Sequence, residues 1–122
     1  MNPSGQIILL LAVMVWLQAC SKNEKTNMII GRWKGSEWLV EGSPSSHAPE
    51  QAIFTFSEDG TYSFEYAGDM EHGTYYVNNS QLFTTPDGGI KIMVKIPKLT
   101  RDTLIFDMNS GGQGEKLTLI RN

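Results

Sequence analysis

The stretch AIFTFSEDGTYSFEY, residues 52–66, is the part of the sequence that decides the fold. Two runs rich in aromatic and β-branched residues flank the polar segment Glu58-Asp59-Gly60. An Asp-Gly pair between two such runs is a strong signal for a β-hairpin. In the second run, Tyr62, Phe64 and Tyr66 alternate with other residues and so share one face of a strand. The stretch predicts an antiparallel hairpin with one apolar face.

The same pattern continues along the chain. Similar runs are separated by turn residues such as Asn78-Asn79 and Gly88-Gly89. The predicted strands cover residues 29–40, 51–57, 61–67, 72–77, 81–85, 90–97, 103–108 and 115–121. About eight short strands joined by tight turns predict an all-β fold, a small up-and-down antiparallel meander barrel. Closing the sheet removes its exposed edges; an open sandwich is the alternative.

The N-terminal segment differs in composition from everything that follows. Residues 7–19, IILLLAVMVWLQA, are almost all apolar, and the chain turns polar directly after Cys20. The run is shorter than the roughly 20 apolar residues that span a bilayer, but it fits the apolar region of a secretory signal. The alternative is an apolar helix in a globular core with a buried cysteine. Apolarity all round and the abrupt polar switch disfavour it.

The residues around this cysteine indicate what it does. Leu17-Gln18-Ala19-Cys20 resembles a bacterial lipobox. The resemblance implies that residues 1–19 are a cleaved signal helix and that Cys20 carries a diacylglycerol and often an N-acyl chain such as palmitate. Residues 20–27 are then a lipidated N-terminus with a polar tether, and residues 28–122 form the folded domain. Two or more acyl chains anchor a protein stably to a membrane.

Composition excludes some classes of function. The chain has 10 Lys and Arg against 13 Asp and Glu, a net charge of −3, which disfavours binding to nucleic acid. The lone cysteine has no CxxC or Cys/His partner spacing, so we predict no metal site and no cofactor. Asp69, Glu71 and His72 are the only acid–histidine cluster, and we predict a polar hairpin turn there. Because no nucleophile elbow, phosphate loop or HExxH motif is present, we predict that the protein is not an enzyme.

The first predicted strand carries a more specific resemblance. Gly31-x-Trp33 resembles the lipocalin fingerprint, and the runs FTFSEDGTYSFEY, HGTYYVNNSQLFTT and EKLTLIRN resemble short lipocalin-like domains of lipoproteins from Bacteroidetes-type bacteria. The resemblance implies that Trp33 plugs the closed end of the barrel and that Arg121 packs over it through a cation–π contact. Gly31, Trp33 and Arg121 are then structural residues.

Aromatic residues are the candidates for ligand binding. Tyr62, Phe64 and Tyr66, together with Tyr75 and Tyr76, would suit an apolar or planar ligand if they face inward and are incompletely packed. The alternative is that they are simply the core.

Trp38 is a further candidate at the start of the segment SEWLVEGSPSSHAPE. It lies five residues after Trp33, so in a regular strand it faces the opposite side. The segment becomes either a loop that covers the barrel mouth or an ordinary surface loop.

These features together predict a lipid-anchored lipocalin-like protein of the cell envelope, a non-enzymatic module that binds a small apolar ligand. The alternative is a protein–protein interaction module with a solid core, either an accessory subunit of an envelope complex or an inhibitor. Ser21, rather than Asp, follows the cysteine, which favours the outer membrane. The mixed charges of Lys22, Glu24 and Lys25 leave open whether the domain faces the periplasm or the cell surface.

Overall fold

The computed structural model describes residues 24–122. Residues 1–19 and Cys20, with the predicted signal and lipidation, lie outside the described residues. The elements are α2 (Glu24–Ile29), β1 (Gly31–Val40), β2 (Ser43–Pro44), the 3-10 turn η1 (Pro49–Gln51), β3 (Ile53–Phe56), β4 (Thr61–Tyr66), β5 (Asp69–Asn78), β6 (Gln81–Pro86), β7 (Ile92–Leu99), β8 (Thr103–Ser110) and β9 (Gln113–Arg121).

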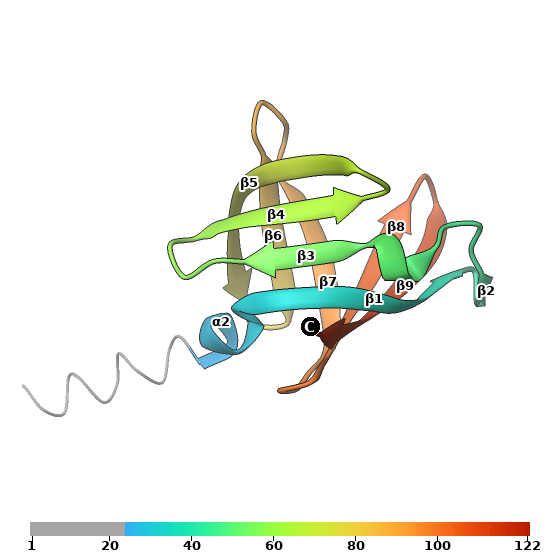
Figure 1. The fold of residues 1–122 in the computed structure, drawn as a ribbon, viewed down its shortest axis with the longest axis horizontal. Helices are drawn as coiled ribbons and strands as arrows, with labels where there is room; N and C mark the ends of the chain where they lie inside the picture. The colour runs from blue at the N-terminus through green and yellow to red at the C-terminus, as the bar shows by residue number, and fades with distance from the viewer. Residues whose placement is uncertain (1–23) are drawn as a thin grey trace, which may run out of the picture.

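The strands form a closed antiparallel barrel of eight strands with one extra strand (Figure 1). From β3 to β9 each strand pairs with its neighbour in the chain, and β1 closes the barrel by pairing with both β3 and β9. The short β2 pairs only with the far end of β1. The predicted meander barrel is confirmed, because local turns pair each strand with the next and the β1–β9 pairing leaves no long free edge.

The hairpin of residues 52–66 forms as predicted. Phe54 pairs with Phe64 and Phe56 with Tyr62, so the aromatic residues of both strands lie on one face. Gly60 has φ +88°, in the left-handed region that favours glycine in such turns. The interior faces of β3 and β4 therefore form one aromatic wall of the barrel.

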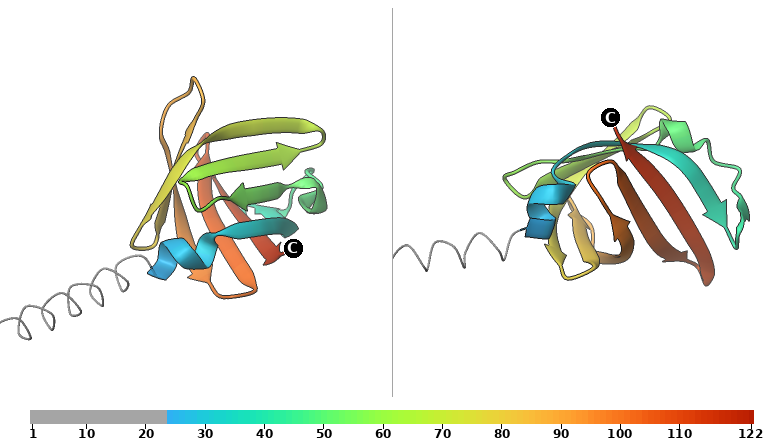
Figure 2. Two further views of the ribbon diagram at one scale, coloured as in Figure 1. Left: turned by 60° about the vertical axis from the view of Figure 1, so that its left-hand side comes forward. Right: turned by 90° about the horizontal axis from the view of Figure 1, so that it is seen from below.

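Part of the predicted tether, residues 20–27, is helical where the chain enters the barrel. Residues 24–29 form the short helix α2, and strand β1 begins at Gly31 rather than at residue 29. Ile29 is fully buried. Figures 1 and 2 show α2 beside one end of the barrel. We expected no helix because six residues are too few to show a helical period; α2 is held by packing against the barrel rather than by its own propensity.

The predicted orientation of Trp38 was wrong. The register of β1 against β9 shifts between Gly35 and Glu37, a β-bulge at Ser36. The extra residue reverses the alternation that follows it. Trp38 consequently points into the barrel, on the same side as Trp33, and packs against the core cluster.

Two other predicted positions differ. The predicted hairpin turn at Asp69, Glu71 and His72 is part of strand β5; the turn itself is Ala67-Gly68, whose φ angles of +51° and +91° suit a tight two-residue loop. The two tyrosines of β5 face opposite sides of the sheet. Tyr75 is buried, whereas Tyr76 is 47% exposed on the outer face.

Candidate functional site

One end of the barrel, next to α2, is plugged. Trp33 is fully buried, and its indole N–H donates to the Ile29 carbonyl at 2.8 Å. The guanidinium carbon of Arg121 lies 4.2 Å from the centroid of the Trp33 ring. The cation–π contact implied by the family resemblance is therefore present.

The guanidinium also ties three segments together. It donates hydrogen bonds to the carbonyls of Ile30, Met28 and Arg101 at 2.9, 2.7 and 2.6 Å. Gly31 has φ +132°, and a Cβ at that position would collide with the Arg121 guanidinium. The Gly-x-Trp motif and the distant arginine are thus parts of one structural plug.

The middle of the barrel is filled by stacked aromatic rings. The ring of Phe54 lies 4.4 Å from that of Phe64, 5.8 Å from that of Phe56 and 5.3 Å from that of Phe106, within the usual range for aromatic pairs. Phe56 and Phe106 are each 1% exposed. In the middle of the barrel the aromatic residues therefore form the hydrophobic core.

Tyr62 is buried in the same interior, and its hydroxyl has a polar partner. A Cβ on Gly73, its cross-strand partner, would press on the Tyr62 ring, so glycine makes room for it. The Tyr62 hydroxyl donates to a carboxylate oxygen of Glu71 at 2.7 Å. Burial, followed by the hydrogen bond and charge of Glu71, raises the pKa of Tyr62 well above its ordinary value. Tyr62 is therefore a packed core residue and not a free ligand contact.

The opposite end, the barrel mouth, carries a second aromatic group, which we call the mouth cluster: Trp38, His47 and Tyr66. The ring of Trp38 lies 4.7 Å from that of His47 and 5.8 Å from that of Tyr66, and the rings of His47 and Tyr66 are 5.6 Å apart. Trp38 and His47 come from one segment, nine residues apart, and Tyr66 comes from the end of β4. The structure brings Trp38 and Tyr66 together with Phe64 near this end and leaves Tyr62 deeper in the core.

The segment after β1 holds the mouth cluster in place. The Trp38 indole N–H donates to Glu115 at 2.9 Å, and the backbone N–H of Ala48 donates to the Tyr66 hydroxyl at 3.1 Å. The Ser45 N–H donates to the Trp38 carbonyl at 2.9 Å. The loop predicted after Trp38 thus lies at the barrel mouth and is bonded to it, although His47 itself is exposed.

Burial varies along the barrel interior, and partly buried residues occur at both ends, with Val77 and Leu99 near α2. Ile29, Trp33, Leu104 and Leu119 are fully buried near α2. Inward-facing residues nearer the mouth remain only partly buried against the core, namely Trp38, Phe54, Phe64, Val94 and Met108. The strands β7 and β8 pair only from Lys95 and Asp107 toward the α2 end, so their mouth-side halves diverge (Figure 1). Trp38 and Phe64, which face inward at this end, are only partly buried.

Sequence reasoning missed two members of this region. His47 lies in an irregular segment with no periodic signal, so only the fold places it against Trp38. Phe54 could have been found, because it alternates with Phe56 in the run AIFTF of residues 52–56.

The described residues hold no group of three or more His, Cys, Asp or Glu side chains placed to bind a metal ion. Within residues 24–122, no helix has the length and apolar character to cross a membrane.

The geometry defines a small antiparallel β-barrel with a Trp33–Arg121 plug at one end and a group of aromatic side chains at the other. A family model for the lipocalin-like domain matches residues 29–106, more than half of the sequence. The chain therefore belongs to the lipocalin-like domain family. No curated protein matches the sequence.

Two solved structures share the fold. A lipocalin-like protein from Bacteroides uniformis ATCC 8492 is 15% identical, with a TM-score of 0.61 over 78% of this chain and 99% of that chain. An uncharacterized protein from Bacteroides eggerthii DSM 20697 is 13% identical, with a TM-score of 0.56 over 76% of this chain and 98% of that chain. At such low identity these likenesses concern the fold alone.

Proposed function

We propose that this protein binds a small apolar, planar molecule at the barrel mouth and acts by binding rather than by catalysis. The observation that carries the proposal is the aromatic group at the mouth: the inward-facing Trp38 and Phe64 are only partly buried there, and His47 and Tyr66 lie against Trp38. Membership of the lipocalin-like family agrees with a binding role.

The mouth cluster offers both apolar and polar contacts. Trp38 and Phe64 are partly buried, and the part of each ring that His47 and Phe54 leave uncovered is the surface on which a planar ligand would stack. The Tyr66 hydroxyl accepts the Ala48 N–H, so its own hydrogen can be donated to a ligand carbonyl or hydroxyl. Apolar walls with a few directed polar groups are typical of small-molecule sites.

The first test uses N-phenyl-1-naphthylamine, a neutral planar probe whose fluorescence rises in apolar surroundings. We expect saturable binding and about a tenfold or greater loss of affinity in Trp38→Ala. Tyr76→Ala is the matched control, because it removes an exposed aromatic ring from the outer face. Equal affinity in both variants, or no saturable binding by the parent protein, would contradict the proposal.

The natural ligand can be sought directly. Purified protein incubated with envelope extract should retain small apolar molecules that mass spectrometry detects, and Trp38→Ala should retain less. Repeated recovery of nothing would count against a ligand-binding role.

We also propose that the domain is held at the outer membrane by lipid on Cys20. The support is the lipobox-like sequence Leu17-Gln18-Ala19-Cys20 and the polar residues that follow it. Two acyl chains provide stable attachment where one is marginal.

A protein-binding role is the second candidate, and one surface favours it. Tyr76, Phe83 and Met93 are cross-strand neighbours on the outer face of β5, β6 and β7. Tyr76 and Met93 are 47% and 44% exposed. Exposed apolar groups gathered in this way often mark interaction sites.

This role predicts a partner that co-purifies in stoichiometric amount with the parent protein and is lost in Met93→Glu. Met70→Glu is the control, because Met70 is 54% exposed on another part of the surface. A partner that both variants retain would exclude this patch as its binding surface.

A further inference from the structure

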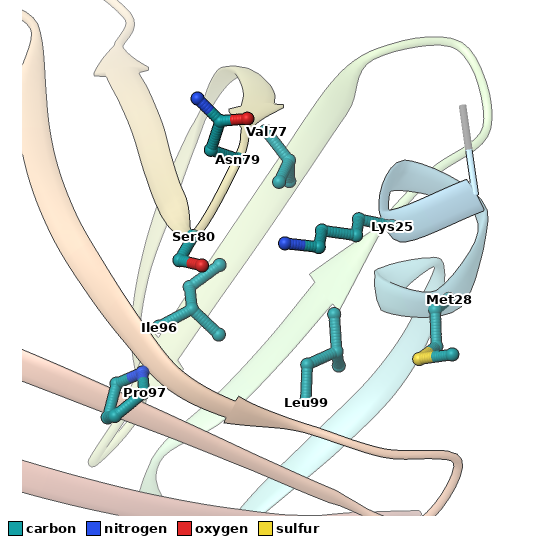
Figure 3. Close-up of a pocket in the computed structure, with 8 residues that line it drawn as sticks. All are labelled: Lys25, Met28, Val77, Asn79, Ser80, Ile96, Pro97 and Leu99. Carbon is teal, nitrogen blue, oxygen red and sulfur yellow. The ribbon is translucent and has the colours of Figure 1, made fainter. Parts of the chain in front are cut away.

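A pocket of about 340 Å³ opens at the α2 end of the barrel, opposite the mouth. It lies between α2, the β5–β6 turn and the end of β7 (Figure 3). Its size is at the lower end of the range of about 300–1,000 Å³ found for small-molecule sites. The plug formed by Trp33 and Ile29 therefore does not seal this end on the side of β5 and β7.

The inner wall of the pocket is apolar. Val77, Ile96 and Leu99 line it, and all three also belong to or pack against the barrel core. Met28 adds a flexible thioether side chain from α2 and is 37% exposed. An aliphatic chain placed here would cover exposed apolar surface, at about 25 cal/mol for each Å² removed from water.

The outer rim carries hydrogen-bond donors and a positive charge. Figure 3 shows the Lys25 ammonium extending from α2 into the space between the helix and the strands, with Asn79 and Ser80 across from it. Among the residues that the structure describes, no acidic side chain lines this pocket. An ammonium, an amide and a hydroxyl around one opening favour an anionic head group.

A local backbone irregularity lies at one edge of the pocket. The register between β7 and β8 shifts between Lys95 and Lys98, and Pro97 lies within this bulge. The Ile96 N–H still bonds to the Ser80 carbonyl at 2.7 Å, so the β5–β6 turn is tied to the bulge. A neighbouring pocket of about 480 Å³ shares Asn79, Ser80, Ile96 and Pro97 but adds the cross-strand neighbours Lys95 and Asp107. The two pockets therefore differ in charge: the described lining of the pocket with Lys25 has a cation and no carboxylate, whereas its neighbour pairs Lys95 with Asp107.

We propose that this pocket binds a medium-chain aliphatic monocarboxylate, such as a free fatty acid, with its carboxylate at Lys25 and its chain against Val77, Ile96 and Leu99. The site is separate from the mouth cluster and does not depend on ligand binding there. The carboxylate accepts hydrogen bonds at the rim, and the chain stays out of water.

The test uses the full chain solubilised in a maltoside detergent and a decanoic acid that carries a diazirine on its chain. After illumination, the attachment sites are mapped by mass spectrometry. We expect labelling of α2 and of residues 96–99, reduced about three- to tenfold in Lys25→Gln. The corresponding diazirine decanol, which has no charge, should label more weakly than the acid and should be unaffected by Lys25→Gln.

Lys34→Gln is the matched control, because Lys34 is an exposed lysine of β1 that does not line the pocket. Its labelling should equal that of the parent. Equal labelling of parent and Lys25→Gln, equal labelling by acid and alcohol, or attachment at Trp38 and Phe64 instead of this pocket would overturn the proposal. Trp38→Ala should leave the acid labelling unchanged, which separates this site from the mouth.

Discussion

At the scale of single residues, the plug explains why a glycine, a tryptophan and an arginine occur together. The positive φ of Gly31 and the close approach of the Arg121 guanidinium both require a residue without Cβ. The arginine in turn covers Trp33 and bonds to three carbonyls. The motif is therefore explained by packing geometry rather than by chemistry on a ligand.

We expect Gly31→Ala to destabilise the protein by about 1–3 kcal/mol, because the new Cβ meets the guanidinium and φ is strained. Arg121→Ala should destabilise as well. The double variant should lose less than the sum of the two, since removing the guanidinium removes the collision. Urea denaturation of the three variants measures this; losses that simply add would contradict the proposed contact.

The buried tyrosines predict a dependence of stability on alkaline pH. Burial, then hydrogen bonding and charge from Glu71, raises the pKa of Tyr62, and burial followed by the charge of Asp59 raises that of Tyr75. Both stay protonated in the fold above about pH 10, where unfolded tyrosine ionises. Unfolding then releases protons, so stability is full below about pH 10 and falls as pH rises further, by up to about 1.4 kcal/mol per pH unit for each tyrosine.

Urea denaturation between pH 8 and 11.5 checks this expectation. Tyr62→Phe should give a shallower alkaline slope than the parent protein. Tyr76→Phe is the matched control, because that ring lies on the outer face. An unchanged slope in Tyr62→Phe would show that this hydroxyl is not protected in the fold.

At the scale of elements, two short irregularities determine the ends of the barrel. The bulge at Ser36 turns Trp38 inward and so builds the mouth cluster. The helix α2 places Ile29 beneath the barrel and supplies Lys25 and Met28 to the pocket beside it. The regular strands form the wall, and these irregular pieces make its two ends different.

If α2 is part of the folded domain, truncating its buried residue should be costly. We expect Ile29→Ala to lower the free energy of unfolding by about 2–5 kcal/mol, as large core truncations do. Met28→Ala, the neighbouring and partly exposed control, should cost less than about 1 kcal/mol. If both variants lost the same small amount of unfolding free energy, residues 24–29 would be a tether and not part of the folded domain.

At the scale of the whole molecule, the position of α2 relates the barrel to the proposed membrane anchor. The four residues from Cys20 to the start of α2 at Glu24 can span at most about 14 Å. A lipid on Cys20 would therefore keep the α2 end near the bilayer and turn the mouth away from it. Fatty acids leaving the membrane would reach the α2 pocket first.

Cys20→Ser should abolish incorporation of labelled palmitate and shift the protein out of the outer-membrane fraction, since no thiol remains to be acylated. The thermal melting midpoint should stay within about 1 °C of the parent value, because Cys20 precedes the barrel. Ser21→Ala should behave as the parent. Palmitate labelling that persists in Cys20→Ser would rule out this anchor.

Local patterns in the sequence were sufficient for the barrel. Alternation at Tyr62, Phe64 and Tyr66 and the turn at Asp59-Gly60 act between residues close in the chain, and strand β4 and its hairpin form where they predict. The same holds for the plug, because a Gly-x-Trp pair and a late arginine are visible in the sequence through a family resemblance.

The two ends of the barrel depended on tertiary structure. A single extra residue at Ser36 reverses every side chain after it, and no local rule locates such a bulge, so Trp38 was assigned to the wrong face. The Lys25 pocket likewise joins segments that are far apart in the chain, and His47 is placed against Trp38 by an irregular segment with no periodic signal. The sequence by itself determined the wall of this barrel, through periodicity and turn chemistry. Only the tertiary structure decided what lies at its openings, because those contacts join residues far apart in the chain.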